Sequence, residues 1–227
     1  MGTSELWTGI VSWLNIKAPV TAKTIRGPAP KSFIRSFEQA APNGWPSDLS
    51  TLYRLFDGAE PSTAGYIFPL YRPLPLAEAE EKRQMLLSIW AQISAEANAE
   101  FERHMRSPLT RNLVAQSTHP EPRKPYDAAR VEALDAGTTA GMFISSYLPI
   151  ADNNSGDLLF VDLRTGAEHG CVREYQKDLA DYRPAIWSSV EELLDDTLSG
   201  LRTGRLAFSA RPSVINGRLN WEYEWER

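Results

Sequence analysis

The sequence predicts an α+β protein in which several helices flank an antiparallel, twisted sheet. Three observations predict this class. Apolar side chains recur every three or four residues through most of the first hundred residues, which is the period of helices. After Gly141 the period shortens to the two-residue alternation of strands, and Asn216-Gly217 near the end marks a hairpin. Helices segregated from antiparallel strands along a chain define the α+β class.

The composition excludes several broad classes of protein. Of 227 residues, 42% are hydrophobic and 23% charged, which is typical of soluble globular proteins. The net charge of −5 argues against nucleic acid as a partner, because nucleic acid selects basic surfaces. A single cysteine, Cys171, rules out an internal disulfide and fits a reducing compartment. Neither a long apolar span nor a signal-peptide pattern occurs, so we expect a cytoplasmic protein with no membrane partner.

The first helix is predicted over residues 4–16. Its apolar side chains recur four residues apart, as in a helix with one buried face. Thr3 or Ser4 is expected to supply the N-cap, and Pro19 closes the segment. Residues 18–30 contain three prolines and one glycine, and we expect a connecting segment there.

Two shorter helices are predicted next. The first ends at the breaker Pro42-Asn43-Gly44, and the second begins with Ser47 as N-cap. Asp57-Gly58 is expected to end the second helix, because glycine adopts the left-handed conformation that finishes many helices. The apolar faces of the two helices consist of Phe33, Ile34, Phe37, Leu49, Leu52, Tyr53 and Phe56.

The longest helix is predicted from Ala77 to about Arg106. Apolar side chains recur on one side of it, and charged side chains face water. The preceding residues, 64–71, have the composition of a short strand that Pro69 confines to an edge or a bulge. The apolar side of the helix consists of Leu86, Ile89, Trp90, Ile93, Ala97, Phe101 and Met105.

The main sheet is predicted in the second half of the chain. Residues 107–140 give the weakest pattern and include a proline-rich polar loop, STHPEPRKPYD. Strands are predicted near 141–150, 157–163 and 169–175, where the two-residue period begins.

A last helix and a hairpin are predicted after these strands. The helix starts at a capping box, for which both Ser188/Glu191 and Ser189/Glu192 have the spacing. The hairpin turns at Asn216-Gly217 and continues as LNWEYEW, a strictly alternating strand. Its apolar side, which we expect to cover the core, consists of Leu219, Trp221, Tyr223 and Trp225.

The polar sextet Asp152-Asn153-Asn154-Ser155-Gly156-Asp157 lies between two predicted strands. It is not an EF-hand, because counting from Asp152 places Asp157 where that loop needs glycine and Leu163 where it needs glutamate. A looser calcium site remains open. Acid–base catalysis by Asp152 and Asp157 would need two carboxylates in opposed environments, and the sextet supplies no such neighbours. Asparagine, aspartate and glycine also stabilise tight turns, and we favour a turn.

We predict no catalytic, cofactor-binding or metal-ligating residues. His104, His119 and His169 are predicted on a helix end, a loop and a strand edge, and no nucleophile, phosphate-binding or metal motif accompanies them. Cys171 is expected to be a buried, unreactive thiol.

Four segments of the chain follow one another in the order used by a known family. They are LWTGIVSWLNIKAP, APKSFIRSFEQAAPNGWPSDLSTLYRLFDGAE, SSYLPIADNNSGDLLFVDLRTG and IWSSVEELLDDTLSGLRTG. The first resembles the opening helix of the SUKH superfamily, the second its helical block, the third its central hairpin and the fourth its late helix. This Smi/Knr-type domain occurs in fungal regulators of cell-wall synthesis and in bacterial toxin-immunity proteins.

The resemblance implies one SUKH-like domain over residues 1–227, with an inserted or loop-rich segment at about 107–140. It also implies a non-enzymatic protein, most often a cytosolic immunity protein that binds a polymorphic or contact-delivered toxin and occludes it. The expected partner is therefore a cognate protein toxin. Groups expected at the rim of the sheet, where they would meet this partner, are Asp57, Glu60, Asp152, Asn153, Asn154 and Asp157.

Two other functions stay open at this point. The fungal relatives suggest a regulatory scaffold of cell-wall or envelope synthesis. A hydrolase that uses the carboxylates of Asp152 and Asp157 is the second alternative. The sequence predicts no oligomeric state.

Overall fold

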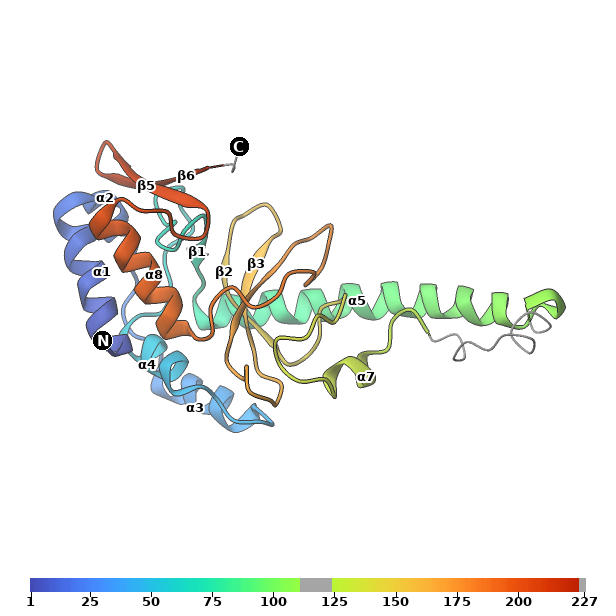
Figure 1. Cartoon of the computed structure of the whole chain (residues 1–227). Coiled ribbons are helices and arrows are strands. Elements are labelled where there is room, and N and C mark those ends of the chain that lie inside the picture. Colours follow the sequence, from blue (N-terminus) through green and yellow to red (C-terminus); the bar gives the residue numbers. More distant parts are fainter. Residues whose placement is uncertain (111–123, 225–227) are drawn as a thin grey trace.

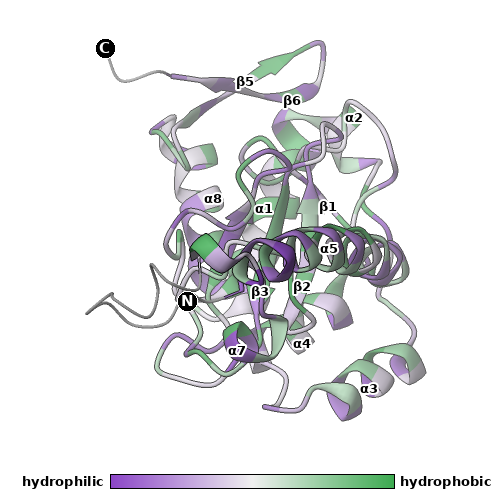
Figure 2. Ribbon diagram, turned by 90° about the vertical axis from the view of Figure 1, so that its right-hand side faces the viewer, coloured by the Kyte–Doolittle hydropathy of each residue, from purple (hydrophilic) through white to green (hydrophobic). Residues whose placement is uncertain are grey.

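The computed structural model describes residues 1–110 and 124–224. A body of helices and strands forms one end of the molecule, and the long helix α5 (Leu76–Met105) crosses it and projects beyond it (Figure 1). This is the helix predicted from Ala77 to about Arg106, so that prediction is confirmed. Figure 2 looks almost along α5 and shows the hairpin at one end of the body and α3 (Lys31–Ala40) at the other.

The main sheet has four antiparallel strands in the order β1-β2-β3-β4. The central strands are β2 (Tyr147–Asp152) and β3 (Leu158–Asp162), with β4 (Val172–Tyr175) on one side and the two-residue β1 (Arg72–Pro73) on the other. All residues of these strands are buried. The predicted α+β class with an antiparallel sheet is confirmed.

Three helices share one apolar cluster with the sheet: α1 (Thr3–Lys17), α4 (Ser47–Leu55) and α8 (Val190–Thr203). Helices α1 and α8 lie so close together that a Cβ atom on Gly9 would be 2.8 Å from Leu198 Cδ2. Glycine at this crossing therefore sets how tightly the two helices pack.

Successive residues of the strands face two different apolar clusters, as the two-residue period requires. Leu148 of β2 and Leu159 of β3 belong to the cluster of α1, α4 and α8. Tyr147 and Phe160 belong to a second cluster, built around Trp90 of α5. The sheet is thus covered on both faces, which explains why its central strands are apolar up to the aspartate that ends each of them.

Ser189 is the N-cap of α8, as the predicted Ser189/Glu192 pair requires, and its Oγ accepts a hydrogen bond from the Glu192 amide at 3.1 Å. The Glu192 carboxylate does not return this bond to the Ser189 amide, as in a full capping box, but accepts one from the preceding Ser188 amide at 2.6 Å. The alternative Ser188/Glu191 is wrong, because Glu191 instead accepts hydrogen bonds from the amide and hydroxyl of Thr3.

Three other predicted helix ends are wrong. Gly2 rather than Thr3 or Ser4 is the N-cap of α1, and Pro46 rather than Ser47 is that of α4. Helix α4 already ends at Leu55. Gly58 has a φ of +70° and lets the backbone of Leu74 and Pro75 pass, since a Cβ there would lie 2.3 Å from the Pro75 nitrogen.

The strand predicted at residues 64–71 is also wrong. The chain turns tightly there, with one bridge between Phe68 and Tyr71, and β1 follows it. Pro69 has no amide hydrogen, and Leu70 has a φ of 67°, so neither can extend a ladder. The other three predicted strands are confirmed, although the first begins at Tyr147 instead of near Gly141.

A separate two-stranded sheet, β5 (Ala210–Ile215) and β6 (Arg218–Tyr223), forms the C-terminal hairpin. Asn216 and Gly217 have φ values of 52° and 73°, so the predicted turn is confirmed. A short helix inside the predicted connecting segment, α2 (Pro19–Ala22), holds this turn: the Val20 amide donates to the Gly217 carbonyl at 2.9 Å.

The hairpin covers the core with only part of its predicted face. Leu219 and Trp221 are buried, but Tyr223 is 42% exposed. Trp225 lies outside the described residues.

The weakly patterned segment 107–140 contains the short helix α7 (Ala128–Glu132). Much of the polar loop STHPEPRKPYD, including His119, falls outside the described residues. After α7 the chain is bound to the sheet by charged groups: Gly137 donates its amide to Asp162 at 3.0 Å, and Gly141 donates its amide to Asp181 at 2.6 Å.

Candidate protein interface

The polar sextet forms the turn between β2 and β3, as predicted. Asn153 Oδ1 accepts hydrogen bonds from the amides of Ser155 at 2.8 Å and Asp157 at 3.1 Å, and Asn153 Nδ2 donates to the Asp157 carboxylate at 2.8 Å. Asn154 and Gly156 take the left-handed conformation, with φ values of 56° and 105°. The polar side chains of the sextet therefore serve first to hold their own turn.

Asp152 is buried beneath the turn, with 2% of its surface exposed. Its carboxylate lies 3.2 Å from Arg72 Nε and 2.9 Å from Lys82 Nζ. Arg72 also binds the carboxylate of Glu78, on the first turn of α5. These ion pairs tie β1, β2 and α5 together, and Asp152 is a structural residue.

Asp57 and Glu60, the other two residues expected at the rim of the sheet, lie apart from this turn. Asp57 is 8% exposed and accepts a hydrogen bond from the Leu76 amide at 2.8 Å, so it satisfies the first amide of α5. Glu60 has 59% of its side chain exposed, and its carboxylate is 3.9 Å from Arg26 Nη1.

The structure thus brings together only Asn153, Asn154 and Asp157 of the six expected interface residues. Tyr66 joins them, because its hydroxyl donates to the Asn153 carbonyl and accepts from Asn154 Nδ2, both at 3.0 Å. The internal hydrogen bonds and ion pairs of Asp57 and Asp152 keep their carboxylates away from a partner in this conformation. A partner-binding role of the six residues stays a prediction.

A hollow opens beside the turn, toward the C-terminal hairpin. The turn and the hairpin both lie on the upper side of Figure 1. We call the hollow beside the turn the first hollow, and its polar and aromatic lining includes Asn153, Asp157, Glu174, Arg183, Phe208 and Tyr223. Tyr71, at its base, donates its hydroxyl to Glu174 at 2.5 Å. Burial, together with the charge of Glu174, raises the pKa of this hydroxyl, so it stays protonated and keeps donating.

A second hollow shares Phe208 with the first. Its lining includes Trp187, Glu192, Asp195, Asp196, Arg205 and Phe208. Trp187 Nε1 donates to Asp196 at 3.1 Å, and Arg205 lies 2.8 Å from the same carboxylate. We call the two hollows together the Phe208 surface.

Phe208 and Ser209 occupy an unfavourable backbone conformation. Their φ values are 44° and 58°, although bulky side chains rarely adopt the left-handed region. Ala207 and Ala210 close the turn around them with two reciprocal backbone hydrogen bonds of 2.9 Å. Strained residues of this kind concentrate at functional sites. The sequence Phe-Ser carries no turn signal, so reasoning from the sequence missed this turn.

The described residues that line the Phe208 surface carry more negative than positive charge. They include five carboxylates and two guanidinium groups. Arg183 lies 3.5 Å from Glu174, and Arg205 pairs with Asp196. The three remaining carboxylates, which have no ion pair with a described residue, are those of Asp157, Glu192 and Asp195.

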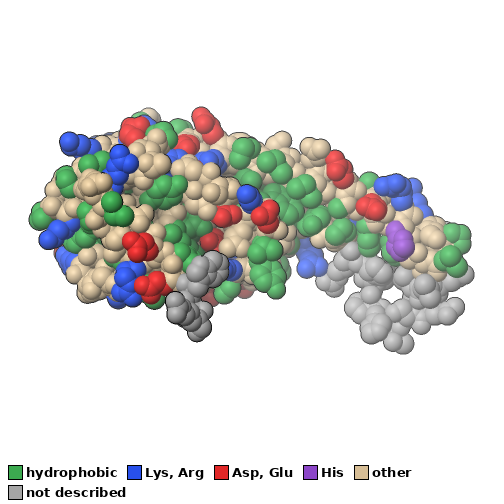
Figure 3. Space-filling model, turned by 90° about the horizontal axis from the view of Figure 1, so that it is seen from above, with side chains coloured by type: hydrophobic (Ala, Val, Ile, Leu, Met, Phe, Trp, Pro, Cys, Tyr) green, Lys and Arg blue, Asp and Glu red, His purple; other side chains and the backbone are tan. Residues whose placement is uncertain are grey.

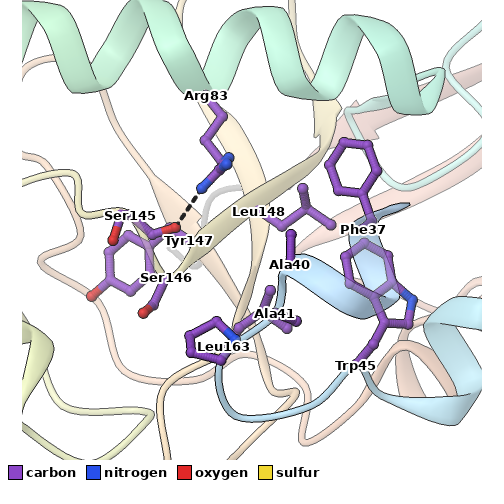
Figure 4. A pocket seen from close by; sticks show the side chains of 11 residues that line it. Phe37, Ala40, Ala41, Trp45, Arg83, Ser145, Ser146, Tyr147, Leu148 and Leu163 are labelled. Atoms are coloured by element: carbon purple, nitrogen blue, oxygen red, sulfur yellow. Dashed lines mark hydrogen bonds between the residues drawn. The ribbon is translucent and has the colours of Figure 1, made fainter. Parts of the chain in front are cut away.

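An apolar pocket lies elsewhere, between α3, α5 and the start of β2 (Figure 4). Phe37 and Trp45 stand on one side of it and Ser145 on the other, while Arg83 reaches in from α5. Arg83 donates to the Ser145 carbonyl at 2.7 Å, and the Ser145 hydroxyl donates to Glu132 at 2.6 Å. Arg83 and Ser145 are thus already bound, whereas the buried Trp45 Nε1 has no hydrogen-bond partner among the described residues. The rest of the lining offers chiefly apolar packing.

The cysteine and the described histidines, which the sequence offered as possible catalytic groups, are held within the fold or lie at a helix end. Cys171 is fully buried, and burial raises the pKa of its thiol to about 12. His169 Nδ1 is 2.8 Å from the Arg164 carbonyl, and His104 lies on the last turn of α5. Within residues 1–110 and 124–224, no three His, Cys, Asp or Glu side chains are grouped so that they could hold a metal ion.

Comparison with known proteins identifies a family. The sequence model of the SMI1/KNR4 family (SUKH-1) matches residues 28–196, more than half of the chain. The matched range contains the main sheet and the turn at 152–157, whereas α1 and the C-terminal hairpin lie outside it. No curated protein matches the chain. In the described part of the chain, no helix has the length and apolar character needed to cross a membrane.

Proposed function

The chain belongs to the SMI1/KNR4 family (SUKH-1), and from this premise we propose that it is a non-enzymatic protein-binding module. In this proposal it is a single domain that acts in the cytoplasm as an immunity protein. It binds a cognate polymorphic or contact-delivered toxin and occludes the active site of that toxin.

The family match is the observation that carries this proposal, because domains of this family generally work as non-catalytic immunity-type proteins. The surroundings of the polar side chains agree with it. Asp152 is held by Arg72 and Lys82, and Asp157 by Asn153 and by the Lys177 amide at 3.1 Å. These two carboxylates thus serve the fold, which favours binding over the hydrolase alternative.

The Phe208 surface supplies a place for such binding. It combines hollows with aromatic side chains, and Tyr182, the neighbour of Arg183 in the chain, is 76% exposed. Tyrosine and arginine are over-represented among the residues that dominate binding energy at protein interfaces. The first hollow is bordered by the turn between the buried strands β2 and β3 and by Glu174 of the buried strand β4. We therefore expect little conformational entropy to be lost there on association.

Part of this surface lies beyond the family match. Asn153, Asp157 and Glu174 fall within residues 28–196, but Phe208 and Tyr223 do not. A surface assembled from a family framework and an additional hairpin would allow recognition of a partner specific to this chain.

Co-expression tests the proposed function. The gene adjacent to that of this protein is expected to encode a toxin whose expression kills cells unless this protein is made in the same cell. The protein and the toxin should also elute as one complex in gel filtration. Death despite co-expression, together with separate elution, would contradict the proposal. A deletion strain with altered sensitivity to cell-wall stress and no linked toxin would support the scaffold function instead.

A further inference from the structure

We propose that the Phe208 surface receives a basic segment of the protein partner, with cationic side chains on both sides of the Phe208 ring. This inference rests on the proposed function and deepens it, because it assigns the chemistry of the partner and the place where it binds. The argument uses the shape, the charge and the rigidity of this surface.

The shape of the surface suits an extended segment. Phe208 lines both hollows, so the two hollows adjoin at this partly buried residue. A segment that crosses Phe208 would place one side chain in each hollow. The first hollow is bounded by the turn at Asn153 and Asp157, and the second by the start of α8 at Glu192 and Asp195.

The unpaired charge is distributed over both hollows. Asp157 lies in the first hollow, whereas Glu192 and Asp195 lie in the second. The hydrogen bonds that Glu192 accepts from Ser188 lower its pKa, so it is ionised at neutral pH. Lys177 packs its methylene groups against Gly156, on the side of the turn, and does not line either hollow. A cation in each hollow would therefore meet a carboxylate that has no ion pair with a described residue.

The ring of Phe208 is held in place before any partner arrives. Its centroid lies 5.2 Å from that of Trp187 and 6.2 Å from that of Tyr71. Together with the closed turn between Ala207 and Ala210, these contacts fix an aromatic face between two negatively charged hollows. Arginine and lysine side chains bind aromatic faces and carboxylates, and a rigid anchor loses little entropy on binding.

A peptide titration tests this inference. The probe is a hexapeptide of arginine, and the matched probe carries citrulline, which has the same shape without the charge. Backbone amide shifts and the indole signal of Trp187 are followed by nuclear magnetic resonance. We expect saturable shifts confined to the Phe208 surface with the arginine peptide, and none with the citrulline peptide.

Two matched double variants assign the effect to this surface. Asp195→Lys with Asp157→Asn removes two of its unpaired charges. The amide oxygen at 157 can still accept from the Lys177 amide, whereas the hydrogen bond from Asn153 Nδ2 is lost. Glu81→Lys with Glu100→Gln makes the same change of charge at exposed positions of α5. Affinity for the arginine peptide is expected to fall about tenfold or more in the first variant and to change less than about twofold in the second.

Specific outcomes overturn the inference. Shifts spread over all acidic surfaces, no saturation, or equal loss in both double variants would show non-specific attraction only. Suppose that the wild-type protein protects cells from a toxin, and that this toxin binds both double variants with wild-type affinity. In that case the partner uses another face, although the proposed function stands. If the protein protects cells from no toxin but binds the arginine peptide as expected, the proposed function fails, while the Phe208 surface remains a site for a basic segment.

Discussion

Arg173 lies on β4 with its side chain fully buried. Its guanidinium donates to the carbonyl groups of Thr138, Asp181 and Arg183 at 2.8 to 3.0 Å. It is also 3.2 Å from the Asp181 carboxylate. Buried charges of this kind cannot be hydrated, so each needs its partners to remain in place. They fix the loops around the sheet, including the one that carries Arg183 to the Phe208 surface.

Asp152 gives the clearest stability prediction among these charges. Asp152→Ala leaves Arg72 Nε buried without its acceptor, while Glu78 still pairs with the same guanidinium, and we expect a loss of about 1.5 to 3 kcal/mol in the free energy of unfolding. Urea denaturation followed by circular dichroism measures it. Asp178→Ala, at an exposed position, should change the value by less than about 0.5 kcal/mol. Equal effects in the two variants would show that the buried ion pairs add nothing.

Cys171 gives a prediction on pH. Its thiol has a pKa near 12 in the folded protein and about 8.5 when unfolded, so the folded state holds the proton more tightly. This contribution to stability is complete below about pH 8.5 and is lost as the pH rises through about 12. At about pH 8 the native protein should resist a disulfide reagent that labels it rapidly in urea. Rapid labelling without urea would contradict the burial of this residue.

At the scale of elements, short sequence patterns correctly predicted the caps, turns and helices that depend on neighbouring residues. The Ser189 cap with its partner Glu192 and the Asn216-Gly217 turn are short-range patterns with a fixed geometry, and both are present. The helix from Leu76 to Met105 follows its apolar period to within one residue. The apolar period does not predict, however, which apolar side chains of this helix are buried. Leu86 and Trp90 are buried by the sheet, whereas Ile89 is 44% exposed.

The elements that were missed depend on contacts between distant segments. The sequence predicts Gly58 as a helix end, but the structure requires glycine there because the backbone of Leu74 and Pro75 passes against it. The short helix α2 is held by the hairpin turn, about two hundred residues away along the chain. For the same reason, two of the six expected interface residues are buried: the partners of Asp57 and Asp152 come from α5 and β1, which no local pattern identifies.

The turn at Phe208 and Ser209 provides a prediction at this scale. Ser209→Gly should raise the free energy of unfolding by about 1 kcal/mol, because glycine adopts a positive φ without strain. Ser88→Gly, at an exposed position within α5, should lower it by about 0.5 kcal/mol, since glycine weakens a helix. Thermal unfolding of the two variants gives both values. Destabilisation by Ser209→Gly would show that the turn is not strained.

The whole molecule combines a body that is covered on both faces of its sheet with a projecting helix. Figure 3 shows apolar side chains along the middle of α5, and charged side chains with a histidine toward its far end. On the body, the same view shows acidic and basic side chains mixed together. The lining of the Phe208 surface differs from this mixture, because its carboxylates outnumber its guanidinium groups.

Salt dependence is expected at this scale. The net charge is −5, and three unpaired carboxylates lie around Phe208, so a basic partner should be drawn toward this surface. Between about 0.01 M and about 1 M salt, where the Debye length falls from roughly 30 to roughly 3 Å, the association rate constant should fall about tenfold or more. Stopped-flow fluorescence of the seven tryptophans, Trp187 among them, reports it. A rate independent of salt would contradict electrostatic steering.

Titration of the purified cognate toxin with this protein tests the central claim most directly, because the claim is that the molecule works by covering another protein. The activity of the toxin on its own substrate is measured as the protein is added, with the complex followed in parallel by light scattering. The account predicts that activity falls to zero at one equivalent, as a complex forms. Full toxin activity in the presence of excess protein would contradict it.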